Sequence, residues 1–289
     1  MELANPIFNN ALMRPLRRAD NAELTWFLRN ARYTHVHVDW YTLADWLDQP
    51  GAVGMEIEGA LVGFLVAGAD PLPASWLRGV AFIGEWPPGT MLERLLGAVV
   101  PALQATHATE LAWMASRRWP DPFIPNLGFQ TITHVVTMIR ETPIMPTFHL
   151  NPAIHIRPVT LADMPRLADI EAAAFAPIWR YSARALERAN SQSYSFDVAL
   201  IDDRVVGYQC STASYYGAHL ARMTVDPAVQ RGGVGTALLA NAIAGYRRGN
   251  LRQMSLNTQT DNISSHYLYR KFGYRETAER LPVWVLPLT

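Results

Sequence analysis

The feature that most constrains this chain is an internal repeat, in which three short motifs recur in the same order at nearly constant spacing. The segment MRPLRRAD at 13–20 recurs as IRPVTLAD at 156–163. LVGF at 61–64 recurs as VVGY at 205–208, and LGF at 127–129 recurs as FGY at 272–274. The offsets are 143, 144 and 145 residues. The chain is therefore expected to contain two copies of one fold.

The segment between the two copies is rich in proline. Residues 142–152, TPIMPTFHLNP, contain three prolines, which restrict the backbone and cannot donate a hydrogen bond. We expect a first domain over 1–141, a linker over 142–152 and a second domain over 153–289. A length of 289 residues suits two domains at roughly 100–200 residues each.

Within the second copy, strand-like and helix-like patterns alternate. This order predicts a mixed α/β sheet with helices on its faces. Strands are expected at 154–158, 197–201, 204–211, 220–225, 253–258 and 283–286, and helices near 161–174, 182–190, 233–248 and 263–272.

Composition excludes several classes of protein. The hydrophobic fraction of 49% is that of a globular chain, and zero net charge argues against a general nucleic-acid binder. The longest uncharged apolar stretch, 59–69, is about half of what a membrane helix needs. Glu2 and its neighbours do not form a signal peptide, and Cys210, a single cysteine, cannot form an internal disulfide. A cytoplasmic protein is expected.

The sharpest local motif is a glycine-rich turn between a strand and a helix, VDPAVQRGGVGT at 225–236. Glycines at 232, 233 and 235 allow unusual backbone conformations and a close approach by a ligand. Free N–H groups and the helix dipole at such a turn favour an anion such as a phosphate. The basic excess of the second half, with 15 Arg and Lys against 11 Asp and Glu after residue 150, is compatible with an anionic ligand.

A second motif lies downstream, with Asn262 followed by LYRKFGY at 268–274. Together the two motifs resemble the signatures of the GNAT superfamily of acyl-CoA-dependent N-acetyltransferases. The first signature, Gln/Arg-x-x-Gly-x-Gly/Ala, corresponds to QRGGVG at 230–235, and the resemblance covers about 154–289. It implies an α/β (α+β) protein of two tandem GNAT-like domains, each a mixed, mostly antiparallel sheet flanked by helices.

The resemblance also implies roles for individual residues. The strand 223–225 would splay at a bulge and pair with the pantetheine amides, while the loop N–H groups would cradle the pyrophosphate. Tyr269 would protonate the departing thiolate; its alternative role is that of a core aromatic residue. The implied cofactor-binding residues are Met223, Thr224, Val225, Gln230, Arg231, Gly232, Gly233, Val234, Gly235, Thr236 and Asn262.

The implied activity is transfer of an acetyl group from acetyl-CoA to an amine of a small molecule or peptide in one ternary complex. No nucleic-acid, membrane or metal partner is expected, and the chain would be a monomer or a homodimer. A binding protein that senses acyl-CoA without turnover is the alternative from another class. Mycothiol synthase, also a tandem GNAT protein with a weak first half, suggests a thiol-precursor amine as a possible acceptor.

One position departs from part of the family. The ribosomal-protein alanine acetyltransferases carry a glutamate general base twelve residues before the tyrosine, where this chain has Asn257. Deprotonation of the amine would then fall to water or to a neighbour such as His219. For His219, Tyr215 and Tyr216, however, a surface or packing role is the preferred interpretation.

The first copy is expected to lack both cofactor binding and catalysis. An offset of 144 places WPPGTM at 86–91 against the glycine loop, and its two prolines lack the N–H groups that would hold a phosphate. Ile124 falls opposite Tyr269, so no acid remains for the thiolate. We expect a GNAT copy without its cofactor loop, kept for packing or acceptor binding.

One other group could in principle hold a metal ion. His35, His37 and Asp39 alternate along the chain and could share one strand face, as zinc ligands do. Two histidines that are hydrogen-bonded or exposed are the preferred interpretation.

Overall fold

The computed structural model describes residues 10–84, 86–142 and 144–288, and the chain divides into two compact units. Unit 1 comprises residues 1–132 and 282–289, and unit 2 comprises residues 133–281. Residues 1–9, on which the expected absence of a signal peptide rests, lie outside the described part. Among the described residues, no helix has both the length and the hydrophobicity to cross a bilayer.

Unit 1 is built on one sheet with the strand order β1-β3-β4-β5-β6-β13. Neighbouring strands in this sheet are antiparallel, except that β5 and β6 run parallel. Strand β2 also pairs with β5, along residues 79–82, on the edge that β6 follows up to Trp76. The elements are β1 (Leu12–Pro15), α1 (Asn21–Asn30), β2 (Tyr33–Val36), β3 (Ala52–Ile57), β4 (Ala60–Gly68), β5 (Ala74–Phe82), α2 (Pro88–Gln104), β6 (Glu110–Met114) and the end of β13 (Arg275–Pro287). Short 3-10 helices are η2 (Arg18–Asp20), η3 (Leu43–Trp46) and η4 (Ile124–Leu127).

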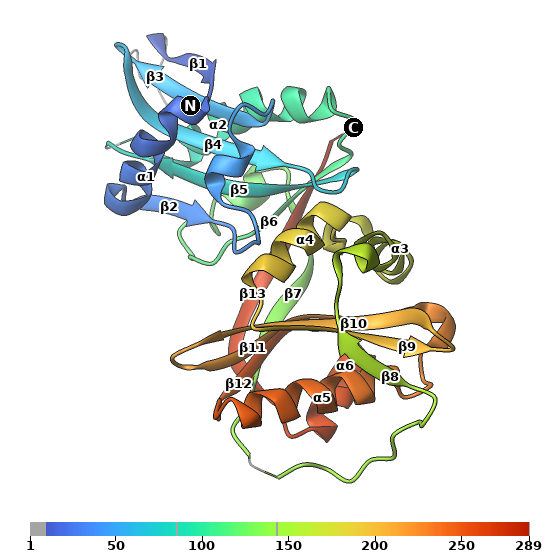
Figure 1. Cartoon of the computed structure of the whole chain (residues 1–289). Coiled ribbons are helices and arrows are strands. Elements are labelled where there is room, and N and C mark those ends of the chain that lie inside the picture. Colours follow the sequence, from blue (N-terminus) through green and yellow to red (C-terminus); the bar gives the residue numbers. More distant parts are fainter. Residues whose placement is uncertain (1–9, 85, 143, 289) are drawn as a thin grey trace. The chain divides into compact units, whose positions relative to one another are not determined.

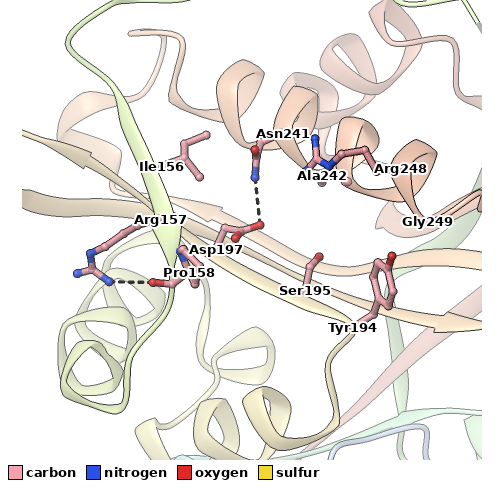
Figure 2. A pocket seen from close by; sticks show the side chains of 11 residues that line it. Ile156, Arg157, Pro158, Tyr194, Ser195, Asp197, Asn241, Ala242, Arg248 and Gly249 are labelled. Atoms are coloured by element: carbon pink, nitrogen blue, oxygen red, sulfur yellow. Dashed lines mark hydrogen bonds between the residues drawn. The ribbon is translucent and has the colours of Figure 1, made fainter.

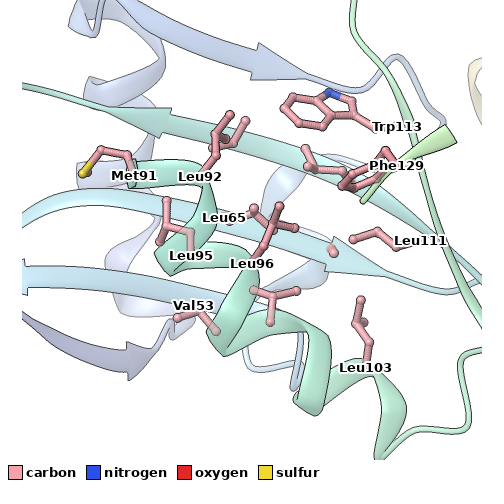
Figure 3. Close-up of a cluster of buried hydrophobic side chains, with 14 of the residues drawn as sticks. Val53, Leu65, Met91, Leu92, Leu95, Leu96, Leu103, Leu111, Trp113 and Phe129 are labelled. Carbon is pink, nitrogen blue, oxygen red and sulfur yellow. The ribbon is translucent and has the colours of Figure 1, made fainter. Parts of the chain in front are cut away.

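The core of unit 1 lies under α2, whose apolar side chains recur at helical spacing and cover the sheet (Figure 3). Successive residues of β4 point to opposite faces. Leu65 therefore joins the cluster under α2, while Phe64 meets the Phe27 ring of α1 at a centroid distance of 6.0 Å. The helix contributes Met91, Leu92, Leu95, Leu96, Val99 and Leu103.

Unit 2 has the strand order β7-β12-β11-β10-β9-β8, with β11 and β12 parallel and the other pairs antiparallel. Helices α3 and α4 lie on one face of its sheet, and α5 and α6 lie on the other (Figure 1). The elements are β7 (Gln130–Arg140), β8 (His155–Pro158), α3 (Met164–Ala174), α4 (Ala183–Gln192), β9 (Ser195–Ile201), β10 (Arg204–Ser214), β11 (Gly217–Val225), α5 (Val234–Arg248), β12 (Met254–Gln259) and α6 (Ile263–Lys271), with η5 (Leu161–Asp163), η6 (Pro177–Trp179) and η7 (Pro227–Val229).

The predicted fold class is confirmed: each unit is a mixed, mostly antiparallel sheet flanked by helices. The expected strands and helices of the second copy are present, with one clear difference in length. The last strand begins at Arg275, well before the predicted 283–286. Exposed polar residues in its first half, such as Glu279, interrupt the alternation of apolar and polar residues by which a strand is predicted.

The compact units do not follow the boundaries expected from the repeat. Residues 135–140 of β7, from the first copy, pair with β12 of unit 2. Residues 283–287 of β13, from the second copy, pair with β6 of unit 1. Each copy thus lends its last strand to the other unit. Short sequence motifs cannot reveal this exchange, because the two copies carry equivalent strands that fit either sheet.

The repeat itself has a direct structural counterpart. In unit 1 the Arg14 guanidinium makes two hydrogen bonds of 2.9 and 3.0 Å to the Asp20 carboxylate. In unit 2 Arg157 and Asp163 form the same fork at 2.7 and 2.8 Å, which lowers the pKa of Asp163 to about 2. The MRPL and IRPV motifs therefore tie the first strand of each copy to the turn that precedes its first helix.

The histidines of unit 1 pack against aromatic rings. The His35 ring lies 5.9 Å from that of Trp113, and His37 stacks on Trp76 at 4.6 Å. Asp39 instead forms an ion pair with Arg78. Within the described part of the chain, no three His, Cys, Asp or Glu side chains gather closely enough to hold a metal ion.

Burial of His35 makes the stability of the protein depend on pH. The side chain is 3% exposed, no partner of normal geometry reaches either ring nitrogen, and burial lowers its pKa to about 4. Between about pH 6.5 and 4 the unfolded state binds a proton that the folded state does not, so stability falls as pH falls. At ~1.36 kcal/mol per pH unit, the loss attributable to this residue reaches about 3 kcal/mol.

We therefore expect His35→Phe to flatten the pH dependence of the unfolding free energy over this range. The measurement is urea unfolding at several pH values between 4 and 7.5. His155→Phe, at an exposed position on β8, is the matched control and should keep the wild-type slope. Equal slopes for the two variants would contradict this account of His35.

Candidate active site

A β-bulge shapes the centre of unit 2. Cys210 of β10 pairs with Arg222 of β11, and Ser211 pairs with Leu220, so Ala221 has no partner. The parallel pairing of β11 with β12 covers only Ala218–Leu220. Beyond the bulge the two strands separate, and none of the described strands pairs with the backbone edge of residues 222–225 on the β12 side. An extended ligand with amide groups can hydrogen-bond to such an edge.

The glycine loop follows β11 and opens α5. Arg231 and Gly233 both have left-handed φ angles, +66° and +90°, which the loop requires to turn into the helix. The N–H of Ala237 donates to Gly233, so Val234, Gly235 and Thr236 keep the free N–H groups of a first helical turn. The N–H of Gly232, in contrast, donates to Val229 O at 3.3 Å and is not available to a ligand.

The splayed edge, the glycine loop and the start of α6 line one cavity of about 900 Å³. Eleven of the twelve site residues predicted from the sequence line it, and Gly232 does not. The eleven are Met223, Thr224, Val225, Gln230, Arg231, Gly233, Val234, Gly235, Thr236, Asn262 and Tyr269.

Tyr269 lies on α6 and is 6% exposed. Burial raises the pKa of its phenol to about 12, although a hydrogen bond with Ser265 and the charge of Arg222 act in the opposite direction. The phenol therefore keeps its proton at neutral pH and can donate it. Asn262 is the N-cap of the same helix: its Oδ1 accepts from Ser265 N at 3.3 Å, which leaves its amide NH2 as a donor.

The cavity contains no obvious general base. Asn257 of β12 lines it, but its Oδ1 accepts from the hydroxyl of Thr137 at 3.0 Å and cannot take a proton at neutral pH. None of the described residues that line the cavity is an aspartate, a glutamate or a histidine. His219 is not in the lining; it makes a 2.9 Å hydrogen bond with Ser255.

The other candidates lie elsewhere. Tyr215 and Tyr216 are 98% and 81% exposed at the turn between β10 and β11, away from the cavity lining. Cys210 is fully buried, and burial raises the pKa of its thiol to about 12, so it is not a nucleophile at neutral pH.

The sequence analysis missed a buried ion pair behind the cavity. Glu171 of α3 is completely buried and accepts hydrogen bonds from Arg222 of β11, from the hydroxyls of Tyr208 and Thr224, both at 2.6 Å, and from the backbone N–H of Tyr181. This network ties α3 and the segment before α4 to the strand that carries the bulge. The sequence pattern could have indicated this burial, because Glu171 lies four residues after Leu167, on the buried face of an amphipathic helix.

A second cavity, of about 610 Å³, lies between β8, β9 and the C-terminal half of α5 (Figure 2). Asp197 is its central side chain, and this carboxylate already accepts hydrogen bonds from Gln209 and Asn241. The described residues that line this cavity include no helix N-terminus. Its residues do not form an acyl-transfer site.

In unit 1 the corresponding strand edge is filled by the chain itself. Strand β5 also bulges, at Arg78, and its parallel pairing with β6 ends at Trp76. Beyond the bulge, β2 pairs with residues 79–82 of β5, where the same edge of unit 2 is open. A ligand cannot form backbone hydrogen bonds to an edge that is already paired.

The loop before α2 also differs from that before α5. Helix α2 begins at Pro88, directly after Pro87, and α5 begins at Val234. The two helix starts therefore align Pro88 with Val234, whereas the constant offset of 144 had aligned Pro88 with Gly232. Ile124 is fully buried in η4, which replaces the helix that carries Tyr269 in unit 2. Unit 1 therefore has a paired strand edge and a helix that begins at a proline where unit 2 has an open edge and a glycine loop.

Comparison with known proteins identifies the class to which this site belongs. Residues 164–274 match the model of the Acetyltransferase (GNAT) family. The match begins at α3 and ends just after α6, so it includes the bulge, the glycine loop and Tyr269. Residues 164–274 of unit 2 therefore match a GNAT acetyltransferase domain.

The relatives are similar to the chain to different extents. It is 40% identical over 53 residues to the uncharacterized protein YxbD of Bacillus subtilis (strain 168), a match covering 18% of this chain and 33% of the relative. The chain spans between 33% and 44% of the length of the curated relatives it matches.

Solved structures match the whole fold. A GCN5-related N-acetyltransferase from Sphaerobacter thermophilus superposes with a TM-score of 0.59 at 15% identity, over 97% of this chain and 96% of its own. A tandem GNAT protein from the clavulanic acid biosynthesis pathway, without AcCoA, gives 0.62 at 13% identity over 96% and 99%. At these identities the likeness concerns the fold, which is that of tandem GNAT proteins.

Proposed function

We propose that the chain transfers an acetyl group from acetyl-CoA to an amine of a small molecule or peptide, within one ternary complex on unit 2. The observation that carries the proposal is the single cavity that joins an open strand edge, a helix N-terminus and a buried, protonated Tyr269. The helix N-terminus suits a pyrophosphate, the open strand edge suits the amides of a pantetheine arm, and Tyr269 suits the thioester at the end of that arm.

The donor would bind through backbone groups. The edge of Met223–Val225 would pair with the pantetheine amides, and the free N–H groups of Val234, Gly235 and Thr236 would hold the pyrophosphate. The amide NH2 of Asn262 would donate to the pantetheine arm. Unit 1, whose equivalent edge is occupied by β2, would bind no donor.

The reaction requires one acid and a neutral amine. The amine nitrogen attacks the thioester carbonyl carbon, and the C–S bond breaks with its electron pair on sulfur. The Tyr269 hydroxyl gives its proton to that sulfur, and the proton released by the amine leaves to water. The products are the N-acetylated amine and CoA with a free thiol, and Tyr269 regains a proton from solvent.

Gly233→Ala is expected to abolish or strongly weaken CoA binding, which should otherwise occur once per chain. A side chain would favour negative φ at a position that requires +90°, and would displace the N–H groups that follow. Isothermal titration calorimetry measures both stoichiometry and affinity.

Gly59→Ala is a matched control, because Gly59 lies in unit 1, has a φ of +78° and leaves open space where the added methyl group would stand. It should cost similar stability and leave CoA affinity unchanged. Two equivalent sites per chain, or equal CoA affinity in the two variants, would refute the assignment of the donor site to unit 2.

Tyr269→Phe is expected to lower kcat by about 10²–10⁴-fold, the usual contribution of a general acid, with little change in affinity for acetyl-CoA. The hydroxyl matters only when charge develops on sulfur. Tyr267→Phe is the control, since Tyr267 lies two residues away on α6, lines the same cavity and is 75% exposed. A kcat of Tyr269→Phe equal to that of the wild type with a good acceptor would show that Tyr269 has only a packing role. If the wild type binds CoA without turnover, the alternative of a protein that senses acyl-CoA is favoured.

The absence of acidic and histidine side chains from the cavity lining favours an acceptor that is easily deprotonated. At about pH 7.5, freeing a lysine amine with a pKa near ~10.4 costs roughly 4 kcal/mol, while an α-amine near ~7.7 costs under ~1 kcal/mol. We expect matched peptides to react faster at the α-amine, with rates that climb with pH. Preference for lysine at neutral pH, with a flat profile above pH 7, would reveal a base outside this lining.

A further inference from the structure

The geometry points to a second group at the reacting thioester: Arg222, held in place by Glu171, stabilises the negative charge that develops on the CoA sulfur as the C–S bond breaks. This inference rests on the proposed function, because it needs acetyl-CoA in the cavity of unit 2. It adds a cation to the chemistry of Tyr269 and makes Glu171 a positioning residue.

The bulge directs Arg222 to the side of the sheet covered by α3. Leu220 and Met223 both pack against the cluster formed with α5, although they are three residues apart rather than two. The extra residue of the bulge accounts for this spacing. Arg222 and Thr224 consequently contact Glu171 on the opposite face, at the point where β11 leaves β12.

The guanidinium is fixed on one side and open on the other. Its Nε donates to Glu171 Oε1 at 3.1 Å, and Nη2 donates to Glu171 Oε2 and to the carbonyl of Trp179. These bonds use all three hydrogens on those two nitrogens, whereas Nη1 makes no hydrogen bond within the described residues and is not sealed from solvent. Arg222 lines the cavity, so two N–H donors of a cation remain for whatever occupies it.

Aromatic rings fix the plane of the guanidinium. Its central carbon lies 3.9 Å from the centroid of the Phe175 ring and 4.6 Å from that of Tyr181. Phe175 also lines the cavity, and the side chain of Arg222 is only 13% exposed. Burial opposes the charged form of Arg222, but the charge of Glu171 outweighs it and raises the pKa, so the cation persists at every pH at which the enzyme would work.

Tyr269 alone is poorly matched to the leaving group. Its phenol has a pKa of about 12, whereas an ordinary thiol has a pKa of about 8.5. Proton transfer from this phenol to a fully formed thiolate is therefore unfavourable, and the sulfur must carry negative charge in the transition state. Arg222 and Tyr269 line the same cavity, and the charge of Arg222 opposes the burial that raises the pKa of the phenol, so this charge also acts on a sulfur beside that hydroxyl.

The experiment measures the thiol pKa of CoA bound to the full-length protein, from the ultraviolet absorbance of the thiolate. In the wild-type complex we expect a value about one unit or more below that of free CoA. Removing Arg222 alone would leave Glu171 as an unpaired buried charge and could unfold the protein. The double variant Glu171→Gln/Arg222→Met removes both charges and keeps an acceptor for Tyr208 and Thr224.

The two variants have opposite expected signs. The double variant should raise the bound thiol pKa to that of free CoA and lower kcat about tenfold per unit of that rise. Glu171→Gln alone removes the neutralising charge but keeps an amide oxygen that can accept from Arg222, whose side chain is 13% exposed where that of Glu171 is 0%, and it should lower the thiol pKa below the wild-type value. If the pair had only a structural role, the bound thiol pKa would not rise in the double variant and fall in Glu171→Gln.

Arg231→Met is the control, because Arg231 is a second arginine in the cavity lining, located in the glycine loop. It should weaken CoA binding and leave the bound thiol pKa unchanged. Failure of wild-type protein to bind CoA would overturn the proposed function. Binding with the same thiol pKa in wild type and in the double variant would overturn the role of Arg222 alone.

Discussion

One backbone irregularity, the bulge at Ala221 in β11, organises unit 2. It ends the pairing of β11 with β12 after three residues and exposes the polar edge of 222–225. The same extra residue turns Arg222 toward α3 and lets Met223 rejoin the core under α5. Unit 1 keeps a bulge in β5 and has lost the opening, because β2 occupies the edge. One added strand can therefore close an edge in a duplicated fold while the bulge in the strand beside it is kept.

The buried pair of Glu171 and Arg222 has an energetic consequence for the whole unit. Desolvating two charges is costly, and the cost is offset only because every acceptor site on Glu171 is used. An apolar pair of similar size would stabilise the fold at least as well. Stability alone therefore does not account for a charged pair beside the cavity.

Local patterns predicted the local parts of this structure. The repeat, the glycine loop and Tyr269 depend on residues close together in sequence; the structure places the loop before α5 and Tyr269 on α6. The Glu171–Arg222 pair joins residues 51 positions apart in the sequence, and β2 pairs with β5 although β3 and β4 lie between them in the chain. No short motif encodes such contacts. The exchange of β7 and β13 was hidden for a further reason: the likeness of the copies, which revealed the duplication, makes their last strands interchangeable.

That exchange sets an order of events during synthesis. Unit 1 contains nearly all its residues before residue 132, but its sheet is complete only when residues 283–287 reach β6. In a chain emerging from the ribosome, the amino-terminal unit therefore lacks its native last strand while more than half of the sequence is still to come. Unit 2, by contrast, receives its borrowed strand before its own residues are made. The first unit to be translated is thus the last that can finish folding.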